Sequence, residues 1–336
     1  MRAGVIVAAA AVLLAVMFAA TLTGSAGMSA RGVALDLIGA LPGVDVDSGL
    51  TAQQHGILWQ IRMPRVVLGA LVGATLAVAG AAYQGVFRNP LADPYLLGVS
   101  SGAGLGATGV IVAGLAVSAY AIPAAAFVGA IIAVVVTLAL GRSVGGGRSE
   151  TVLILAGVAV AAFANAGQTF LMQRYSENLR RIYSWLLGRL TTDGWTDVWV
   201  LAPYAAVTVL VVLLHRRTLD VMLVGDTEAA SLGMDPTRVR LLLIGVATLG
   251  TAAAVSVSGL IGFVGIVVPH AVRMVVGPGH RLLLPLSVLI GAAFLVAADL
   301  LARTALAPAE LPIGVVTAAI GAPFFLLVLR RSRGAL

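Results

Sequence analysis

The sequence predicts an all-α membrane protein with about ten transmembrane helices, and its composition and length carry that prediction. Hydrophobic residues make up 60% of the 336 residues and charged residues only 10%, with a mean hydropathy of +1.04. Such values are typical of polytopic membrane proteins and exclude an ordinary soluble domain. The length allows about ten apolar segments of roughly 20 residues, which is the span needed to cross a bilayer.

Ten apolar segments are separated by polar or proline-containing connections. In chain order we expect spans at Val5–Thr21, Pro64–Gln84, Tyr95–Leu115, Ala119–Leu140, Thr151–Met172, Asp197–Leu214, Leu241–Ser258, Leu260–Val276, Leu282–Leu301 and Pro312–Leu329. A cleaved signal peptide is an alternative for the first segment, but the many later spans favour a retained helix. Met28–Gln60 is expected to be a polar connection.

The arginines predict which side each connection faces. An even number of spans puts both termini on one side, and assigning them to the cytoplasm places thirteen of the twenty-one arginines there. This agrees with the positive-inside rule, although the margin is small. The unusually many arginines on the external side call for a functional explanation. They include Arg62, Arg65, Arg174, Arg180, Arg181, Arg189 and Arg303.

Two spans echo each other across the chain. Arg65 opens the second expected span and Arg240 the seventh, and each is followed by a Gly- and Ala-rich helix. Because these spans lie five apart and run in opposite directions, we expect an inverted repeat that relates helices 2–5 to helices 7–10, as in many transporters. The whole chain, residues 1–336, is expected to form one transmembrane domain.

Missing residue types exclude several kinds of chemistry. The chain has no Cys, which excludes disulfides, thiolate metal sites and Cys nucleophiles. It has no Lys, whereas a Walker A phosphate loop needs one, so an ATP-driven process would need its motor in another polypeptide. His55, His215, His270 and His280 show no metal-binding spacing, so neither a metal nor a cofactor is expected in this chain.

Other motifs favour a structural interpretation. Gly104–Gly109 matches G-x-G-x-x-G, but it lies inside an apolar span with no preceding strand, so we interpret it as helix packing. The arginines lie at span ends without interleaved aromatic residues, which argues against nucleic-acid binding. No pair of carboxylates converges within the apolar runs, which argues against a hydrolase and against an ion-coupled carrier.

Asp220–Arg240 is the most polar segment between two spans. It holds four of the fourteen acidic residues and is flanked by apolar runs, so it must project into water. The pattern predicts two short helices with a turn at Gly233, the first capped by Asp226 or Thr227. Such a segment is either a solvated loop or a docking surface for a partner.

Two further polar features lie at a membrane boundary and within a span. Pro90 and Pro94 interrupt the helix in Gln84–Gly98, where Asn89 and Leu91 could constrict a pore. Asn165 and Gln168 lie one turn apart, facing either a helix partner or a water-filled path.

Arg62, Arg65 and Arg303 lie together at the expected outer mouth. They could present a cationic ring to acidic groups of an external protein. The alternatives are anchoring at the membrane interface and, for Arg303, a simple ion pair with Asp299 one turn earlier.

Four long motifs carry a resemblance to a known family. They are WQIRMPR (Trp59–Arg65), FRNPLADPYLLGVSSGAG (Phe87–Gly104), GFVGIVVPHAVRMVVG (Gly262–Gly277) and ELPIGVVTAAIGAPFF (Glu310–Phe325). In this order they resemble the FecCD family, the permease subunits of type II ABC importers for ferric siderophores, haem and cobalamin.

The resemblance implies an assembly in a bacterial cytoplasmic membrane. It comprises two permease subunits, with a homodimer favoured, two cytoplasmic ATPase subunits that bind ATP and Mg²⁺, and an external substrate-binding protein. It further implies that Arg62, Arg65 and Arg303 meet the binding protein and that Asn89 and Leu91 form the cytoplasmic gate. Asp220–Arg240 would couple to the ATPase through Asp226, Glu228, Ala229, Ser231, Leu232, Gly233 and Met234.

The sequence thus predicts a permease that imports a metal chelate, with a ferric siderophore ahead of haem and cobalamin. One departure from the family is the loop Gly145–Gly147, to which no role is assigned. The rival class is a stand-alone secondary carrier or channel. A membrane scaffold or sensor is a third possibility, disfavoured because a scaffold needs no broken helix.

Overall fold

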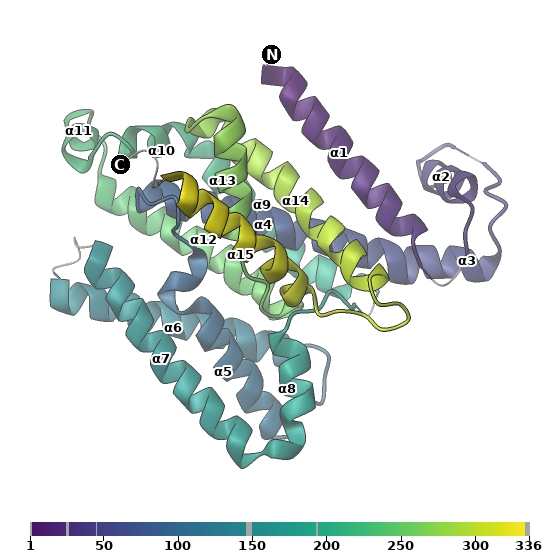
Figure 1. Cartoon of the computed structure of the whole chain (residues 1–336), viewed down its shortest axis with the longest axis horizontal. Coiled ribbons are helices and arrows are strands. Elements are labelled where there is room, and N and C mark those ends of the chain that lie inside the picture. Colours follow the sequence, from purple (N-terminus) through teal and green to yellow (C-terminus); the bar gives the residue numbers. More distant parts are fainter. Residues whose placement is uncertain (1, 25–26, 45, 146–149, 193, 333–336) are drawn as a thin grey trace.

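The computed structural model describes residues 2–24, 27–44, 46–145, 150–192 and 194–332, and every regular element in these ranges is a helix (Figure 1). The elements in chain order are α1 (Arg2–Leu22), α2 (Ala30–Gly39), α3 (Ala52–Ile57), the π-helical turn η1 (Leu58–Arg62), α4 (Met63–Val86), the 3₁₀ turn η2 (Pro94–Leu97), α5 (Val99–Val112), α6 (Ala121–Gly145), α7 (Glu150–Arg174), the 3₁₀ turn η3 (Ser176–Asn178), α8 (Leu179–Leu186), α9 (Thr196–Leu214), α10 (Arg216–Met222), α11 (Asp226–Ser231), α12 (Pro236–Ser258), α13 (Val264–Val276), α14 (His280–Thr304) and α15 (Ile313–Ser332). Gly146 and Gly147 of the Gly-rich loop, and two of the thirteen arginines assigned to the cytoplasm, Arg148 and Arg333, lie outside the described residues.

The all-α prediction is confirmed, and the number of spans agrees approximately with ten. Within the described ranges, seven helices are long and apolar enough to cross a membrane. Three shorter apolar helices, α5, α13 and α15, match the remaining expected spans. The helices α2 and α3 lie at one end of the bundle and α10 and α11 at the opposite end, and we refer to these as the α2 end and the α10 end (Figure 1).

The expected spans Tyr95–Leu115 and Leu260–Val276 were too long. In place of the first, the chain makes the turn η2 and then starts α5 after Gly98, whose φ is +83°. In place of the second, α13 starts only after Phe263, whose φ of +69° is rare for a residue with a side chain. Both helices begin with a buried residue, so each chain break lies inside the protein, where irregular backbone is tolerated.

Helix lengths support the inverted repeat. The elements α4, α5, α6 and α7 have 24, 14, 25 and 25 residues, and α12, α13, α14 and α15 have 23, 13, 25 and 20. A long helix followed by a short helix and then two long ones therefore occurs twice, in the two predicted halves.

Glycines set how closely the helices pack around the buried helix α4. A side chain at Gly73 would overlap the backbone of Gly291 on α14, and one at Gly80 would overlap Gly265 on α13. Gly102 meets Gly129 in the same way where α5 crosses α6. The Gly-x-x-x-Gly pattern of α5 is therefore a packing site, because only a residue without Cβ lets two backbones approach this closely.

The segment Met28–Gln60 is more ordered than a polar connection. Ser29 caps α2 by accepting a hydrogen bond from Gly32, and Thr51 and Gln54 form a capping box at the start of α3. The helix α3 continues through η1 into α4, so the expected span at Pro64 is extended by three turns toward the α2 end.

Candidate functional site

The three mouth arginines lie together at the α2 end and are paired within the chain. Arg65 donates to both oxygens of Asp299, at 2.8–3.1 Å, and to Glu310 at 2.9 and 3.2 Å. Arg303 Nε lies 3.0 Å from the other side of the Asp299 carboxylate, close enough for an ion pair but without hydrogen-bond geometry. We call Arg62, Arg65, Asp299, Arg303 and Glu310 the arginine cluster.

Two of these arginines also cap a helix. Arg62 donates to the carbonyls of Thr21 and Leu22 at 2.8 and 2.9 Å, and Arg303 to those of Ala20 and Thr23. The carbonyls of Ala20, Thr21 and Leu22 lie in the last turn of α1 and that of Thr23 follows it, so cations there are favourable for hydrogen bonding and for the helix dipole. The expected pair of Arg303 with Asp299 is confirmed, whereas the role of the three arginines in docking stays a prediction.

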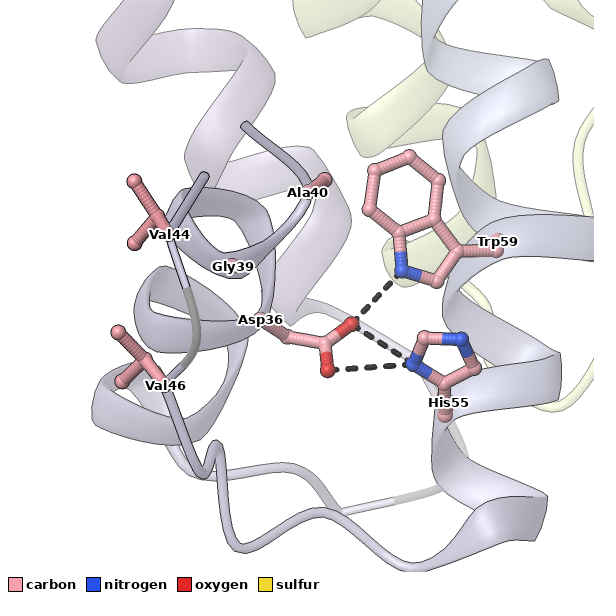
Figure 2. A pocket seen from close by; sticks show the side chains of 7 residues that line it. All are labelled: Asp36, Gly39, Ala40, Val44, Val46, His55 and Trp59. Atoms are coloured by element: carbon pink, nitrogen blue, oxygen red, sulfur yellow. Dashed lines mark hydrogen bonds and ion pairs between the residues drawn. The ribbon is translucent and has the colours of Figure 1, made fainter. Parts of the chain in front are cut away.

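A cavity of about 380 Å³ lies beside this cluster, between α2 and α3 (Figure 2). The Asp36 carboxylate accepts a hydrogen bond from Trp59 Nε1 at 2.7 Å and faces His55 Nδ1 at 3.0 Å. Burial raises the pKa of Asp36, but the hydrogen bonds from Trp59, His55 and Ser48 outweigh burial and lower it overall. Trp59 belongs to the same π-helical turn as Arg62, so this contact ties the α2 segment to the arginine cluster.

The Asp36 contact was not predicted, because Met28–Gln60 was expected to be a polar connection without helices of its own. The capping residues Ser29 and Thr51 were the signal that could have revealed two helices there.

The two predicted gate residues, Asn89 and Leu91, lie in the chain break after α4 and differ in their exposure. Asn89 is exposed, and its side-chain oxygen accepts from the Leu91 backbone at 2.9 Å, which forms an Asx turn. Leu91 is half-buried. Arg88, with a φ of +47°, lies 3.7 Å from Asp226 of the segment Asp220–Arg240, which we call the coupling segment after its predicted role. The gate assignment stays a prediction, but the break and the coupling segment are in contact.

The two predicted pathway residues of α7, Asn165 and Gln168, lie in different surroundings. Gln168 is buried, and its amide lies against Gly104 of α5, so this side chain faces a helix partner. Asn165 is exposed on the outside of α7. Gln168 thus packs against a neighbouring helix, and the predicted pathway-lining roles of Gln168 and Asn165 both stay predictions.

The coupling segment, Asp220–Arg240, lies at the α10 end and contains one of the two predicted short helices, α11. The second short helix was wrong, because the chain after Gly233 starts the 23-residue helix α12 directly. The helix α11 begins after Gly225, and α12 begins at Pro236 with Asp235 as its N-cap. Gly233 has a φ of +81° and makes the predicted turn between them. The expected cap is wrong, because Asp226 is already helical and its carboxylate accepts instead from Arg240 at 3.1 Å.

The coupling segment presents apolar side chains to its surroundings. Leu232 is 73% exposed and Val224 71%, whereas Ala229 is fully buried and Met234 packs against the core. Glu228, Ser231 and Gly233 are exposed too. An apolar surface at the polar end of a bundle is favourable only when a partner covers it.

The remaining histidines make structural contacts. His280 donates its backbone N–H to Asp220 at 2.8 Å, and its Nδ1 lies at the same distance from that carboxylate. His215 Nδ1 contacts the Val211 carbonyl, and His270 packs edge-on against Phe324. The expectation of no metal site in this chain stays an expectation.

One polar contact between α4 and α13 was missed. Gln84 donates to the Gly265 carbonyl at 3.1 Å and accepts from Arg273 at 2.7 Å. Gln84 and Arg273 stood out in the sequence as polar residues next to apolar runs, but nothing in it showed that they meet.

Comparisons with known proteins agree with the motifs. The FecCD transport family matches residues 11–331. The cobalamin import system permease protein BtuC of Halobacterium salinarum is 44% identical over 84% of this chain and 75% of its own length. The Fe(3+)-citrate import system permease protein YfmE of Bacillus subtilis is 38% identical over 84% of both chains, and the hemin transport system permease protein HmuU of Yersinia pestis is 37% identical over 82% of this chain and 84% of its own.

A solved structure has the same fold. A metal-chelate type ABC transporter in an inward-facing conformation superposes with a TM-score of 0.84 and 29% identity, covering 98% of this chain and 99% of that one. The match extends across the broken helices, the arginine cluster and the coupling segment. The chain therefore belongs to the FecCD family of ABC-importer permease subunits.

Proposed function

We propose that this chain passes a metal chelate inward across a bacterial cytoplasmic membrane, with both termini and the α10 end in the cytoplasm. A binding protein delivers the chelate at the α2 end, and two separate ATPase subunits bind ATP and Mg²⁺ and supply the energy. A second permease subunit, most simply a copy of this chain, completes the path. No covalent chemistry takes place in this chain; the chelate moves through a conformational cycle.

The surface of the coupling segment is the observation that carries this proposal. Leu232 and Val224 are exposed at the end of the bundle where α10 and α11 project, and the chain has no Lys for an ATPase site of its own. An apolar, water-facing surface on a transporter without a motor is suited to a separate ATPase. A stand-alone carrier has no use for such a surface.

The arginine cluster supports delivery at the α2 end. Asp299 is nearly inaccessible, but the Glu310 side chain is 50% exposed and holds only the outer side of Arg65. An acidic side chain of the binding protein can therefore replace Glu310 without disturbing Asp299. Because Arg62 and Arg303 also bind the carbonyls at the end of α1, docking of the binding protein at the arginine cluster would directly affect the position of α1.

Gating is proposed for the break between α4 and α5. Asn89 and Leu91 lie on a turn whose neighbour Arg88 contacts Asp226 of the coupling segment. A movement of that segment on ATP binding would thus act on the gate through this ion pair. The path between mouth and gate would pass the exposed Asn165.

The motif resemblance ranks a ferric siderophore first among the candidate cargoes, whereas the identities of the named relatives support cobalamin. Cobalamin is favoured by the 44% identity to a permease whose name specifies that ligand, whereas relatives named for ferric citrate and hemin are 37–38% identical. The binding protein that stimulates this permease decides the matter. Its absorption spectrum after purification without added ligand would distinguish a corrin or porphyrin from a ferric siderophore.

Uptake by the reconstituted transporter tests the proposal as a whole. Proteoliposomes that contain this chain, its ATPase and the loaded binding protein should accumulate the radiolabelled chelate only with ATP. Liposomes that contain this chain alone should show no uptake under a proton or sodium gradient. Uptake by the chain alone would refute the proposal and support the secondary carrier.

A further inference from the structure

A second cationic pocket opens at the α2 end, away from the arginine cluster. It lies between the first turns of α6 and α9, the helix α8 and the last turn of α12, and its volume is about 280 Å³. Arg181 and Arg189 line it together with the indole of Trp185 and the hydroxyl of Thr191. We call it the α8 pocket.

Positive charge exceeds negative charge in the α8 pocket. Arg181 donates one hydrogen bond, to the Ala116 carbonyl at 3.3 Å. In the part of the chain that the structure describes, no carboxylate forms an ion pair with Arg181 or Arg189. Asp197 also lines the pocket and has an interaction of its own, so two guanidinium groups face one carboxylate.

The backbone adds to this positive potential and holds the arginines in place. The helices α6 and α9 begin at the pocket, and helix N-termini carry partial positive charge. The Arg189 N–H donates to the Ser258 carbonyl at 2.7 Å, which fixes the loop to the end of α12. Ile182 and Trp185 bury one face of α8, so Arg181 is carried on an anchored helix.

The arginines of the arginine cluster are already occupied. Arg65 and Arg303 share Asp299, and Arg62 binds the carbonyls of α1. An incoming carboxylate must compete with those internal partners, whereas at the α8 pocket it meets exposed guanidinium groups directly.

The size of the α8 pocket limits what it can hold. Sites for drug-sized molecules have volumes of roughly 300–1,000 Å³, so about 280 Å³ is small for a metal chelate but ample for one side chain. We propose that the α8 pocket is a second docking socket, which receives an acidic side chain of the substrate-binding protein between Arg181 and Arg189. The inference rests on the proposed function and adds a contact point to it.

The experiment measures how the loaded binding protein binds to the complex of this chain and its ATPase in nanodiscs. The test variant is Arg181→Glu with Arg189→Glu. The matched control is Arg180→Glu, which makes the same change one residue earlier on α8, at an exposed arginine that does not line the pocket. Unfolding temperature and size-exclusion profile verify that each variant is folded.

We expect the double variant to raise the Kd at least about ten-fold, since opposite charges in contact become like charges. Arg180→Glu should change it less than about three-fold, because it alters only the long-range field. High salt should weaken binding to the wild-type complex and reduce the difference in Kd between the double variant and the wild type.

Cross-linking provides a second, independent measurement. Because the chain has no Cys, Ser118→Cys at the pocket gives a single attachment point for a maleimide photo-cross-linker. It should capture the binding protein at an acidic surface segment. Tyr183→Cys should not, because Tyr183 is exposed and lies two residues from both Arg181 and Trp185, on the opposite side of α8.

Unchanged affinity in the double variant would overturn the socket. Loss of co-purifying phospholipid from that variant, with unchanged affinity, would overturn it in favour of a lipid headgroup site. If the binding protein does not stimulate even the wild-type complex, the proposed function fails, and the socket with it.

Discussion

Asp299→Asn tests whether the arginine cluster holds the α2 end together. Asp299 is 4% exposed and pairs with both Arg65 and Arg303, so the substitution leaves these two arginines with only one acidic partner in the arginine cluster, the half-exposed Glu310 on Arg65. Removing one partner of a buried ion pair costs roughly 3–5 kcal/mol. Because Asn keeps the shape and one hydrogen-bond acceptor, we expect the lower value, about 3 kcal/mol.

The chain offers a matched control on the same arginine. Glu310 also binds Arg65 but is 50% exposed, so Glu310→Gln should cost under about 1 kcal/mol. Taking about 2 °C per kcal/mol for a chain of this size, the apparent Tm should fall by about 6 °C in Asp299→Asn and by under about 2 °C in Glu310→Gln. Thermal unfolding in detergent at a fixed scan rate, followed by fluorescence, measures both. Equal shifts in the two variants would refute the assignment of Asp299 as the centre of the cluster.

Three further predictions follow from packing, coupling and protonation. Gly80→Leu should prevent stable folding, because its side chain would overlap the α13 backbone. Gly109→Leu, whose side chain would enter open space, should change the free energy of unfolding by under about 0.5 kcal/mol. The yield of folded protein in detergent and the unfolding temperature measure both effects. Leu232→Asp should weaken the affinity for the ATPase subunits about ten-fold in a pull-down titration without changing membrane insertion, and unchanged affinity would return the segment to a plain loop. The pKa of Asp36 is lowered from 3.8 in the folded state, so the ionised carboxylate stabilises the fold above pH 3.8, and this stability is lost as the pH falls through the folded-state pKa. The fluorescence of Trp59, obtained as the difference from a Trp59→Phe variant, should therefore change below about pH 4 in the wild type. The Asp36→Asn variant should show no such change.

Periodicity and composition predicted what the membrane dictates. Apolar runs of sufficient length gave α1, α6, α7, α9 and α14 to within a few residues, because a helix surrounded by lipid must satisfy its backbone internally. The turn at Gly233 was predictable too, because it depends on local residues. The short helices α5 and α13 were not, because their starts depend on a buried break that only neighbouring helices make tolerable.

The site was predictable in its residues and not in its contacts. The arginines Arg62, Arg65 and Arg303 attracted attention as charges at the ends of apolar runs. That Arg62 holds the carbonyls of α1, some forty residues away, depends on tertiary packing that no local pattern encodes. The motif ELPIG contained Glu310, but nothing in it showed a contact with Arg65, 245 residues earlier.

The link between Asp220 and His280 gives α14 a mechanical role. Asp220 begins the coupling segment and holds the first turn of α14, a helix whose 25 residues span about 37 Å and whose last turns carry Asp299 and Arg303. Pro285 removes one backbone hydrogen bond near the α10 end, so bending concentrates there and the rest of the helix moves as a stiff rod. We expect a movement of the coupling segment, caused by the ATPase, to displace α14 as a whole and so to shift Asp299 and Arg303 in the arginine cluster. The same movement would then weaken binding of the substrate-binding protein and open the gate.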